Sequence, residues 1–334
     1  MILVARIALV SLVCAWVSIG VAAETTRKAS KSKPAAAAST APKLTLLPVQ
    51  GNVYLVSGGA RNVVIQVASE GVLYVDSATV ELADQILGIT ATLSKRPIRY
   101  VLNTHVHPEN VGGNQVLSRK GISYGGGNTR DQQFALIYAH ENVLNAMSAP
   151  TGKQAALPSD FWPTDTYFEH SMELHFNGES VELLHQPSAH TDGDSVVFFR
   201  SSDVLVTGDM FLTTGYPIID IARGGTVNGL IDALNRIIDI AVPRENQEDG
   251  TLIVPGQGRI CDEYDVVVYR DMVTIVRDRV QDMQKKGMTL EQVQRTRPSS
   301  DYDVLFTAGP GRATPEQFVE SIYRTLQPAA ASAE

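Results

Sequence analysis

The sequence predicts an α+β protein in which two β-rich halves are each flanked by helices. Two observations support this class. Short apolar or alternating runs are separated by turn-forming residues, and amphipathic segments of helical length lie between groups of them. The chain has 334 residues, of which 44% are hydrophobic and 19% charged. That composition is typical of a globular protein with one large or two small domains.

Four apolar or alternating runs predict a β-meander at the start of the first half, because Gly-containing turn sequences separate them. The four strands are expected at residues 44–49, 53–56, 63–68 and 72–75. A helix is expected over residues 81–95, where apolar residues recur at helical spacing. A strand over residues 98–102 and a short helix near residues 114–119 follow.

The remaining strands and helices continue the same mixed pattern. Further strands are expected at residues 135–139, 172–176, 181–185, 195–199, 204–206 and 252–254. Helices are expected over residues 230–240 and 263–286, and Gly287 ends the longer one. A last helix is predicted to begin at Thr314-Pro315-Glu316-Gln317, which supplies an N-cap, a first-turn proline and a capping-box glutamine.

The amino terminus predicts export. Residues 1–23 contain a single charge at Arg6, an uncharged and mostly apolar stretch, and Ala22-Ala23 at the end, which is the pattern of a secretory signal peptide. An uncleaved membrane anchor is the alternative, because the apolar stretch is near the lower limit for spanning. The mature protein is therefore expected in the periplasm or outside the cell.

Residues 24–43 predict a disordered low-complexity tether rich in Ala, Ser, Thr, Pro and Lys. The tether carries a net charge of +4 and the leader +1, so the total of −8 leaves −13 on residues 44–334. An acidic body and export both argue against a nucleic-acid partner. A peripheral contact between the basic tether and the cell envelope is one reading of it, and a solvated spacer is the other. The oligomeric state is open.

The domain that carries the function is expected over residues 44–330, ending in a helical extension. Without the leader, Cys261 is the only cysteine, so no disulfide can form within the chain. The fold must therefore depend on its hydrophobic core, which a chain of this length can supply.

A cluster of potential metal ligands follows the predicted strand at 98–102. His105 and His107 are one residue apart, Glu109 comes two residues later, and Gly112-Gly113 lets the backbone fold tightly against them. In an isolated H-x-H, the histidines are more often hydrogen-bonded structural residues than metal ligands, so the interpretation depends on residues further along the chain.

Three later strand ends carry matching chemistry: His190-Thr191-Asp192-Gly193-Asp194, Thr207-Gly208-Asp209 and Pro255-Gly256-Gln257-Gly258. With these motifs in this order, the sequence resembles the metallo-β-lactamase superfamily from about Val53 to about Leu326. In that family T-H-x-H-x-D-H, A-H-T-x-G-[DS], T-G-D and P-G-H-G turns converge on one or two metal ions. The resemblance implies an αββα sandwich, with two mixed β-sheets face to face, helices outside, and metal at the edge between the sheets.

Carried over residue by residue, the resemblance implies an intact first metal site formed by His105, His107 and His190. Three neutral imidazoles leave a tetrahedral zinc ion one open position for water, whose pKa can fall to roughly 7. Asp209 matches the carboxylate that reaches both metals in the family. Asp76 matches a residue that orients the ligands from outside the coordination sphere.

The second metal site departs from the family pattern. Glu109-Asn110 stands where the family has Asp-His, and Gln257 stands where it has His. Glutamate keeps the carboxylate but adds a methylene, and the amide oxygens of Asn110 and Gln257 are poor zinc ligands compared with imidazole. We therefore expect one tightly bound Zn²⁺, or a second position with weak, oxygen-preferring metal binding.

The implied activity is zinc-dependent hydrolysis of a small-molecule ester, thioester, lactone or amide, β-lactams included, through a metal-bound hydroxide. Glu109 or Asp209 would hold or deprotonate the attacking water. The alternative is a catalytically weakened binding or accessory protein of the cell envelope, in which loss of the second metal has removed useful activity.

Other polar residues receive different readings. Arg223 follows the Asp209 strand, where it would either hold a substrate carboxylate or pair with Asp220. His140 is expected to cap a helix or to make a core hydrogen bond. We assign no metal role to His170, His175 and His185, and we expect Cys261 to be buried or to start a helix rather than act as a nucleophile.

Overall fold

The computed structural model describes residues 42–123, 134–148, 154–248, 250–306 and 312–326. The predicted leader and nearly all of the predicted tether therefore lie outside the described residues. Within the described ranges, none of the helices combines the length and apolar character that a membrane crossing needs.

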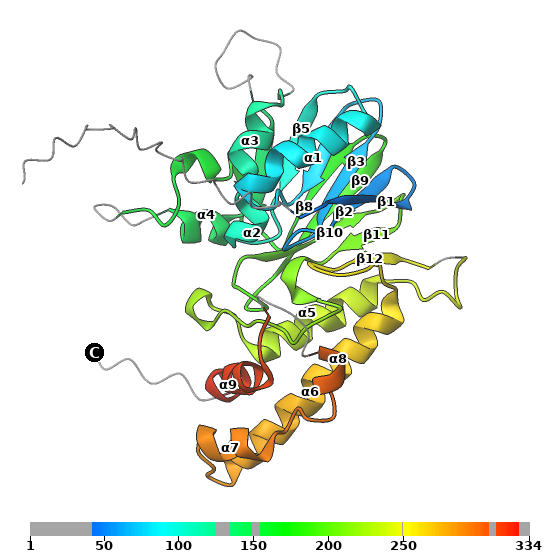
Figure 1. The fold of residues 1–334 in the computed structure, drawn as a ribbon. Helices are drawn as coiled ribbons and strands as arrows, with labels where there is room; N and C mark the ends of the chain where they lie inside the picture. Colours follow the sequence, from blue (N-terminus) through cyan, green and yellow to red (C-terminus); the bar gives the residue numbers. More distant parts are fainter. Residues whose placement is uncertain (1–41, 124–133, 149–153, 249, 307–311, 327–334) are drawn as a thin grey trace, which may run out of the picture. The chain divides into compact units, whose positions relative to one another are not determined.

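Two mixed β-sheets form the centre of the fold (Figure 1). The first has seven strands in sequence order: β1 (Thr45–Gln50), β2 (Val53–Ser57), β3 (Val63–Val67), β4 (Val72–Val75), β5 (Ile98–Leu102), β6 (Leu136–His140) and β7 (Asp165–Tyr167). Neighbouring strands from β1 to β4 are antiparallel, and those from β4 to β7 are parallel. This is the predicted meander followed by a parallel extension.

The second sheet has five strands, in the order β12 (Leu252–Val254), β11 (Val204–Val206), β10 (Asp194–Phe199), β9 (Glu179–Gln186) and β8 (Ser171–Phe176). Strands β8 to β11 pair in antiparallel fashion, whereas β11 and β12 are parallel. The parallel pair places the ends of β11 and β12 at the same edge of the sheet.

Alternation along the strands separates the core into layers. In β2 the Leu55 side chain joins a cluster shared by both sheets, whereas its neighbour Val56 joins a cluster with the helices outside the first sheet. In β10, Val197 faces the shared cluster and Val196 faces the helices outside the second sheet. Because successive strand residues point to opposite faces, the apolar residues of these two strands are buried on both faces.

Helices cover the outer face of each sheet. Against the first sheet lie α1 (Val80–Leu93) and α3 (Asn114–Arg119). Against the second sheet lie α5 (Val227–Ile240), α6 (Glu263–Lys285) and α9 (Pro315–Thr325). Shorter helices are α2 (Pro108–Val111), α4 (Glu141–Met147), α7 (Leu290–Thr296) and α8 (Asp303–Phe306). The predicted αββα sandwich is confirmed.

Short elements account for most of what the sequence patterns missed. β7 has three residues and α2, α4, α7 and α8 have four to seven, so none is long enough to show a clear periodicity. His140 caps α4, because its Nδ1 accepts a hydrogen bond from the backbone N–H of Asn142 (3.3 Å). The prediction that His140 has a capping role is therefore confirmed.

The topology gathers the chemically interesting turns at one edge of the two sheets. The parallel strands β4 and β5 end there, and so do β11 and β12. The antiparallel strands β3 and β10 begin there, because each starts beside the end of β4 or β11. Backbone hydrogen bonds connect the two sheets at this edge: the N–H of Ser195 donates to the carbonyl oxygen of Thr104, and the N–H of Asn62 donates to that of Gly256, both at 2.8 Å.

Candidate metal centre

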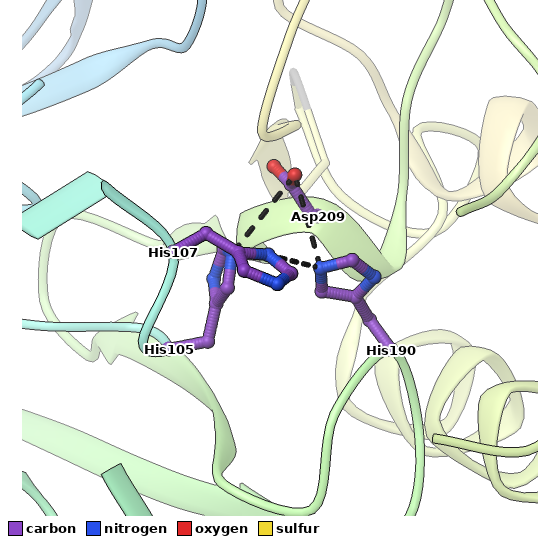
Figure 2. Close-up of side chains that lie close together, drawn as sticks. All are labelled: His105, His107, His190 and Asp209. Atoms are coloured by element: carbon purple, nitrogen blue, oxygen red, sulfur yellow. Dashed lines mark hydrogen bonds and ion pairs between the residues drawn. The ribbon is translucent and has the colours of Figure 1, made fainter. Parts of the chain in front are cut away.

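Four side chains from distant parts of the sequence meet at this edge. Figure 2 shows His105, His107, His190 and Asp209 pointing toward one another, and their ligand atoms all lie within 4.8 Å of one another. His107 is half-buried, and the other three are buried. The structure thus brings together all four residues that the resemblance assigns to the first metal.

Each member of this group sits on a turn next to a strand. His105 and His107 lie between β5 and α2, and His190 lies between β9 and β10. Asp209 lies in a short 3-10 turn, Gly208–Met210, directly after β11. Rigid strands therefore fix the positions of turns that are themselves irregular, which is how scaffolds commonly present ligands.

Every imidazole of the group has a hydrogen-bond partner for its outer nitrogen, the one that faces away from the other rings. The pairs are His105 Nδ1 with Thr104 Oγ1 (2.9 Å), His107 Nε2 with Asp220 Oδ2 (2.9 Å) and His190 Nδ1 with the carbonyl oxygen of Ile218 (2.6 Å). The carboxylate and the carbonyl can only accept, and the Thr104 hydroxyl already donates to Asp76. We therefore assign the ring proton of each imidazole to its outer nitrogen.

The inner nitrogens then carry lone pairs that face one another. His107 Nδ1 and His190 Nε2 are 2.9 Å apart, and His105 Nε2 is buried without a hydrogen-bond partner among the described residues. Converging lone pairs without a proton between them are unfavourable unless a cation lies among them. An arrangement in which outer contacts fix the tautomer and inner nitrogens converge is that of metal-ligating histidines.

The distances from Asp209 to two of the imidazoles also suit a small metal ion. Two ligands that each lie about 2.0–2.1 Å from one zinc ion can be at most about 4.2 Å apart. The Oδ2 atom of Asp209 lies 3.9 Å from His105 Nε2 and 4.0 Å from His190 Nε2. Three imidazoles and a carboxylate suit zinc, and they also suit other transition metals, so the donor set fits a metal without naming it.

Electrostatics keeps two of the imidazoles neutral, as metal binding requires. Burial lowers the pKa of His105 well below its usual value, and the neighbouring imidazoles and Arg61 lower it further. Burial also lowers the pKa of His190, and this outweighs the opposing effect of Asp209. A metal ion therefore does not have to displace a proton from either ring near neutral pH.

Asp76 contacts residues next to the candidate metal ligands without being one of the four. Its carboxylate, at the end of β4, accepts hydrogen bonds from the backbone N–H and the hydroxyl of Thr104 and from Nδ2 of Asn110, each 2.8 Å long. Burial raises the pKa of Asp76 to about 7, although these donors oppose the shift. Because Thr104 also contacts the outer nitrogen of His105, Asp76 lies where a residue that orients this ligand would lie.

The residues of the predicted second metal site are differently placed. Asn110 is buried, gives its Nδ2 to Asp76, and leaves Oδ1 without a hydrogen-bond partner in the described part of the chain. Gln257 follows β12 and contacts the Thr213 backbone N–H through its own carbonyl oxygen (3.2 Å). Glu109 is not among the four potential metal ligands that cluster in the described residues.

Arg61 is the residue of this site that the sequence analysis missed. It lies in the loop between β2 and β3, and its Nε contacts both carboxylate oxygens of Asp209 (2.7 and 2.6 Å). Its Nη2 lies 3.6 Å from Oε1 of Glu109. Gly58-Gly59 marks the loop as a turn, but nothing local in the sequence indicates a partner 148 positions later.

Asp209 packs against glycine on two sides. Gly208 has a φ of +53°, which favours glycine, and a Cβ there would also crowd the Thr104 side chain. A Cβ on Gly256 would collide with Oδ1 of Asp209. The glycines of the T-G-D and P-G-Q-G sequences therefore allow the carboxylate to sit between the ends of β11 and β12.

Arg223 forms the ion pair that was one of its two readings. Its Nη1 lies 2.6 Å from Oδ2 of Asp220, the atom that also contacts His107. Burial raises the pKa of Asp220, but hydrogen bonds from His107 and Arg223 outweigh it, so the net pKa is below its usual value. A substrate contact by Arg223 stays a prediction. Cys261 is buried, as expected, and burial raises the pKa of its thiol.

Two facing mixed sheets with helices outside, and a three-histidine cluster at their shared edge, define the class of this protein. The chain belongs to the metallo-β-lactamase superfamily, whose sequence profile matches residues 46–244. The match includes the turns that carry Arg61, His105, His190 and Asp209, and it ends before β12. The predicted family membership is confirmed.

Individual relatives and solved structures agree with this assignment. A linear primary-alkylsulfatase from Pseudomonas sp. (strain ATCC 19151) is 23% identical over 269 residues, which cover 68% of this chain and 48% of that protein. The chain thus spans about half the length of this relative. The structure of the inverting sec-alkylsulfatase Pisa1 from Pseudomonas sp. matches with a TM-score of 0.58 at 15% identity, covering 84% of this chain and 50% of that one.

A metallo-β-lactamase from Pontibacter korlensis matches with a TM-score of 0.53 at 15% identity, covering 70% of this chain and 99% of that one. At such identities the solved structures show a shared fold. Alkylsulfatases and metallo-β-lactamases are hydrolases, and this chain combines their fold with a candidate metal centre.

Proposed function

We propose that this chain is a hydrolase that uses one tightly bound zinc ion to cleave a small-molecule ester, thioester, lactone or amide. The observation that supports it most is the convergence of three unprotonated imidazole nitrogens, each with its outer nitrogen held by an acceptor. Histidines with a purely structural role do not have to direct unprotonated nitrogens toward one point, whereas histidines that bind one metal ion must do so.

When bound, the metal ion supplies a Lewis acid that acidifies a coordinated water and polarises the substrate carbonyl or its equivalent. The residues of this chain do the rest. His105, His107 and His190 would hold the metal ion, and hydrogen bonds to their outer nitrogens already fix their tautomers and ring orientations. The buried environment strengthens every charge–charge interaction at this edge of the sheets.

Glu109 is the better candidate for the group that takes a proton from the water. Both oxygens of Asp209 already accept from Nε of Arg61, whereas Glu109 meets Arg61 only at 3.6 Å. The Glu109 side chain is also 34% exposed, so a proton it has accepted can leave to solvent. Asp209 would serve to anchor the centre.

We infer that Arg223 contacts the substrate. Its side chain is 42% exposed, and Asp220 links it to the ligand His107. A partly exposed guanidinium linked through Asp220 to His107 would favour substrates with an anionic group. The names of the relatives add sulfate esters and β-lactams to the acyl compounds that should be tried.

The first experiment combines metal analysis with an activity screen. The protein, purified without added metal, is expected to hold about one zinc ion per chain and to hydrolyse at least one of an aryl ester, a thioester, a lactone, a β-lactam and an alkyl sulfate. His107→Ala should lose both. His175→Ala, in a strand of the second sheet and 79% exposed, is the matched control and should keep both. Failure to bind metal even when zinc is supplied would contradict the proposal.

The second candidate is a binding or accessory protein that has kept the fold and lost useful turnover. The replacement of both second-site histidines by Asn110 and Gln257 favours it. The same screen separates the two candidates. Stoichiometric zinc without hydrolysis of any substrate, together with binding of one of them, would support the second.

We also propose that the chain is exported, with residues 1–23 as leader and residues 24–43 as a basic tether. The charge and hydropathy pattern of the amino terminus supports this. Fractionation of cells that make the full chain, followed by amino-terminal sequencing, tests it. A protein that stays in the cytoplasm with Met1 intact would contradict it. Binding to anionic vesicles, compared with a chain beginning at Leu44, tests an envelope contact of the tether.

A further inference from the structure

We propose that the guanidinium of Arg61 takes the place of a second metal ion, so that this centre is built to hold one metal and a fixed organic cation. The proposal concerns the same centre as the proposed function. It does not depend on turnover, however, because it is tested by metal content.

The contacts of Arg61 support this directly. A second metal would be held by the carboxylates that the chain still offers there, Asp209 and Glu109. Arg61 reaches both, with Nε at 2.7 and 2.6 Å from the two oxygens of Asp209 and Nη2 at 3.6 Å from Glu109. One cation thus already lies between the two carboxylates.

Burial makes this pairing hard to replace. The side chain of Asp209 is 1% exposed and that of Arg61 is 7% exposed, so solvent screens their attraction very little. A buried carboxylate without a partner is strongly unfavourable, and Arg61 supplies the partner. A further dication at the same oxygens would have to approach the guanidinium closely and would be repelled by it.

The loop that carries Arg61 is fixed in position. Nη1 of Arg61 donates to the carbonyl oxygen of Ala60 (3.0 Å). The next residue, Asn62, donates its backbone N–H to Gly256 (2.8 Å) and its Nδ2 to the carbonyl oxygens of Pro255 (2.9 Å) and Gly258 (3.1 Å). The β2–β3 loop is therefore tied to the turn that carries Gln257, and the guanidinium is a built part of the site.

The two replaced histidines fit the same explanation. Asn110 donates its amide nitrogen to Asp76, and the carbonyl oxygen of Gln257 accepts a hydrogen bond from the backbone N–H of Thr213. If a guanidinium neutralises Asp209, imidazoles at these two positions have no metal to bind. The arginine and the two amides then form one coordinated change from a two-metal to a one-metal centre.

Metal stoichiometry in a set of variants tests this inference. In Asn110→His/Gln257→His, both imidazoles of the family pattern return while Arg61 remains. We expect this variant to bind about one zinc ion per chain, as the wild type does. Adding Arg61→Met, which keeps side-chain length and removes the charge, should raise the content to about two. Arg61→Lys in the same background should keep it near one.

Two results would overturn the proposal. The first is two tightly bound zinc ions in Asn110→His/Gln257→His with Arg61 intact. The second is no gain of metal when Arg61→Met is added to a variant that circular dichroism shows to be folded. Arg119→Ala, which breaks an exposed pair with Asp160, is the matched control for loss of an arginine and should leave the stoichiometry unchanged.

A measurement on the wild type covers the case in which the triple variant does not fold. With excess Mn²⁺, the wild-type protein should give the electron paramagnetic resonance spectrum of an isolated ion. A spin-coupled pair of manganese ions would show that two metals bind beside Arg61, and would contradict the proposal. This experiment also remains informative if the protein hydrolyses none of the substrates in the screen.

Discussion

The candidate metal centre has two sides that differ in how positive charge is supplied: the three histidines form the histidine side, and Arg61 with Asp209 and Glu109 forms the arginine side. On the histidine side, three imidazoles converge with their protons turned outward, and burial lowers the pKa of His105 and His190. On the arginine side, Arg61 already neutralises Asp209 and approaches Glu109. The first side could hold a cation taken from solution, whereas the second carries its own.

This difference shows how one fold can change its metal content without losing the centre. The anionic residue Asp209 is shared by both sides, so a positive charge must be near it in either case. A guanidinium meets that need through hydrogen bonds and cannot lose its proton in a protein. It also cannot activate water as a metal ion can, so any activation of water by a metal would have to come from the histidine side.

The largest effect is expected from a change on the histidine side. His107→Ala removes one of three nitrogen ligands, and loss of a direct ligand should cost more than the roughly 10- to 100-fold typical of a contact outside the coordination sphere. Zinc affinity, measured by competition with a chromophoric chelator, should therefore fall by more than about 100-fold. An unchanged affinity would mean that the metal lies elsewhere, and the comparison of the two sides would fail.

The next largest effect is expected on the arginine side. Arg61→Met should lower the free energy of unfolding of the metal-free protein by about 3 to 5 kcal/mol, because it leaves the buried charge of Asp209 unpaired. Chemical denaturation measures this loss, and excess divalent metal should reverse part of it. A variant as stable as the wild type without metal would show that Arg61 is not the cation that Asp209 requires.

A smaller effect is expected when the acceptor of one ligand is removed. Asp220→Ala deprives His107 of the partner for its outer nitrogen, which should lower zinc affinity roughly 10- to 100-fold. Arg223→Ala breaks the ion pair with Asp220 but leaves the contact to His107, so its zinc affinity should stay close to that of the wild type. Equal losses in the two variants would indicate that the whole loop, and not this acceptor, supports the site.

The smallest effect is expected on the pH dependence of stability, from His140, a buried histidine that belongs to neither side of the centre. Burial and the nearby His185 lower the pKa of His140 from 6.5 to about 4. The unfolded chain then binds a proton that the folded protein does not, so stability is lost as the pH falls from about 6.5 toward 4. Between pH 7 and pH 5 the wild type should lose on the order of 1–2 kcal/mol more than His140→Asn, which keeps a capping acceptor.

Denaturation curves of both proteins at the two pH values give this difference. Other buried histidines, His105 and His190 among them, add to the pH dependence of both proteins equally and cancel in the comparison. Identical pH dependence in the two proteins would mean that His140 is not protonated on unfolding in this range.

The sequence revealed the histidine side because its signals are local. Two of the ligands are one residue apart, and His190 and Asp209 each lie in a turn bounded by an apolar strand and glycine. The four-motif order then fixed the fold class, and the bounds of most strands were predicted to within two residues. Local spacing and strand ends are properties that a single sequence displays.

The arginine side could not be predicted from the sequence, because its contacts join residues that are far apart along the chain. The Arg61–Asp209 contact joins residues 148 positions apart, and it depends on how the β2–β3 loop is tied to the turn after β12. The same holds for Asp220, whose position next to Arg223 predicted their ion pair but not the hydrogen bond to His107, 113 positions away. Such partners follow from tertiary packing, to which no local pattern points.

The ligands of the centre come from both sheets, with His105 and His107 following β5 and His190 preceding β10. A bound metal would therefore act as a cross-link that closes the chain segment between residues 105 and 190. For a loop of that length, the chain-entropy relation used for covalent bridges gives an upper limit of about 4 to 5 kcal/mol. Residues 44–334 contain a single cysteine and so can form no disulfide among themselves, and a bound metal ion would give this part of the chain the kind of restraint that a disulfide gives elsewhere.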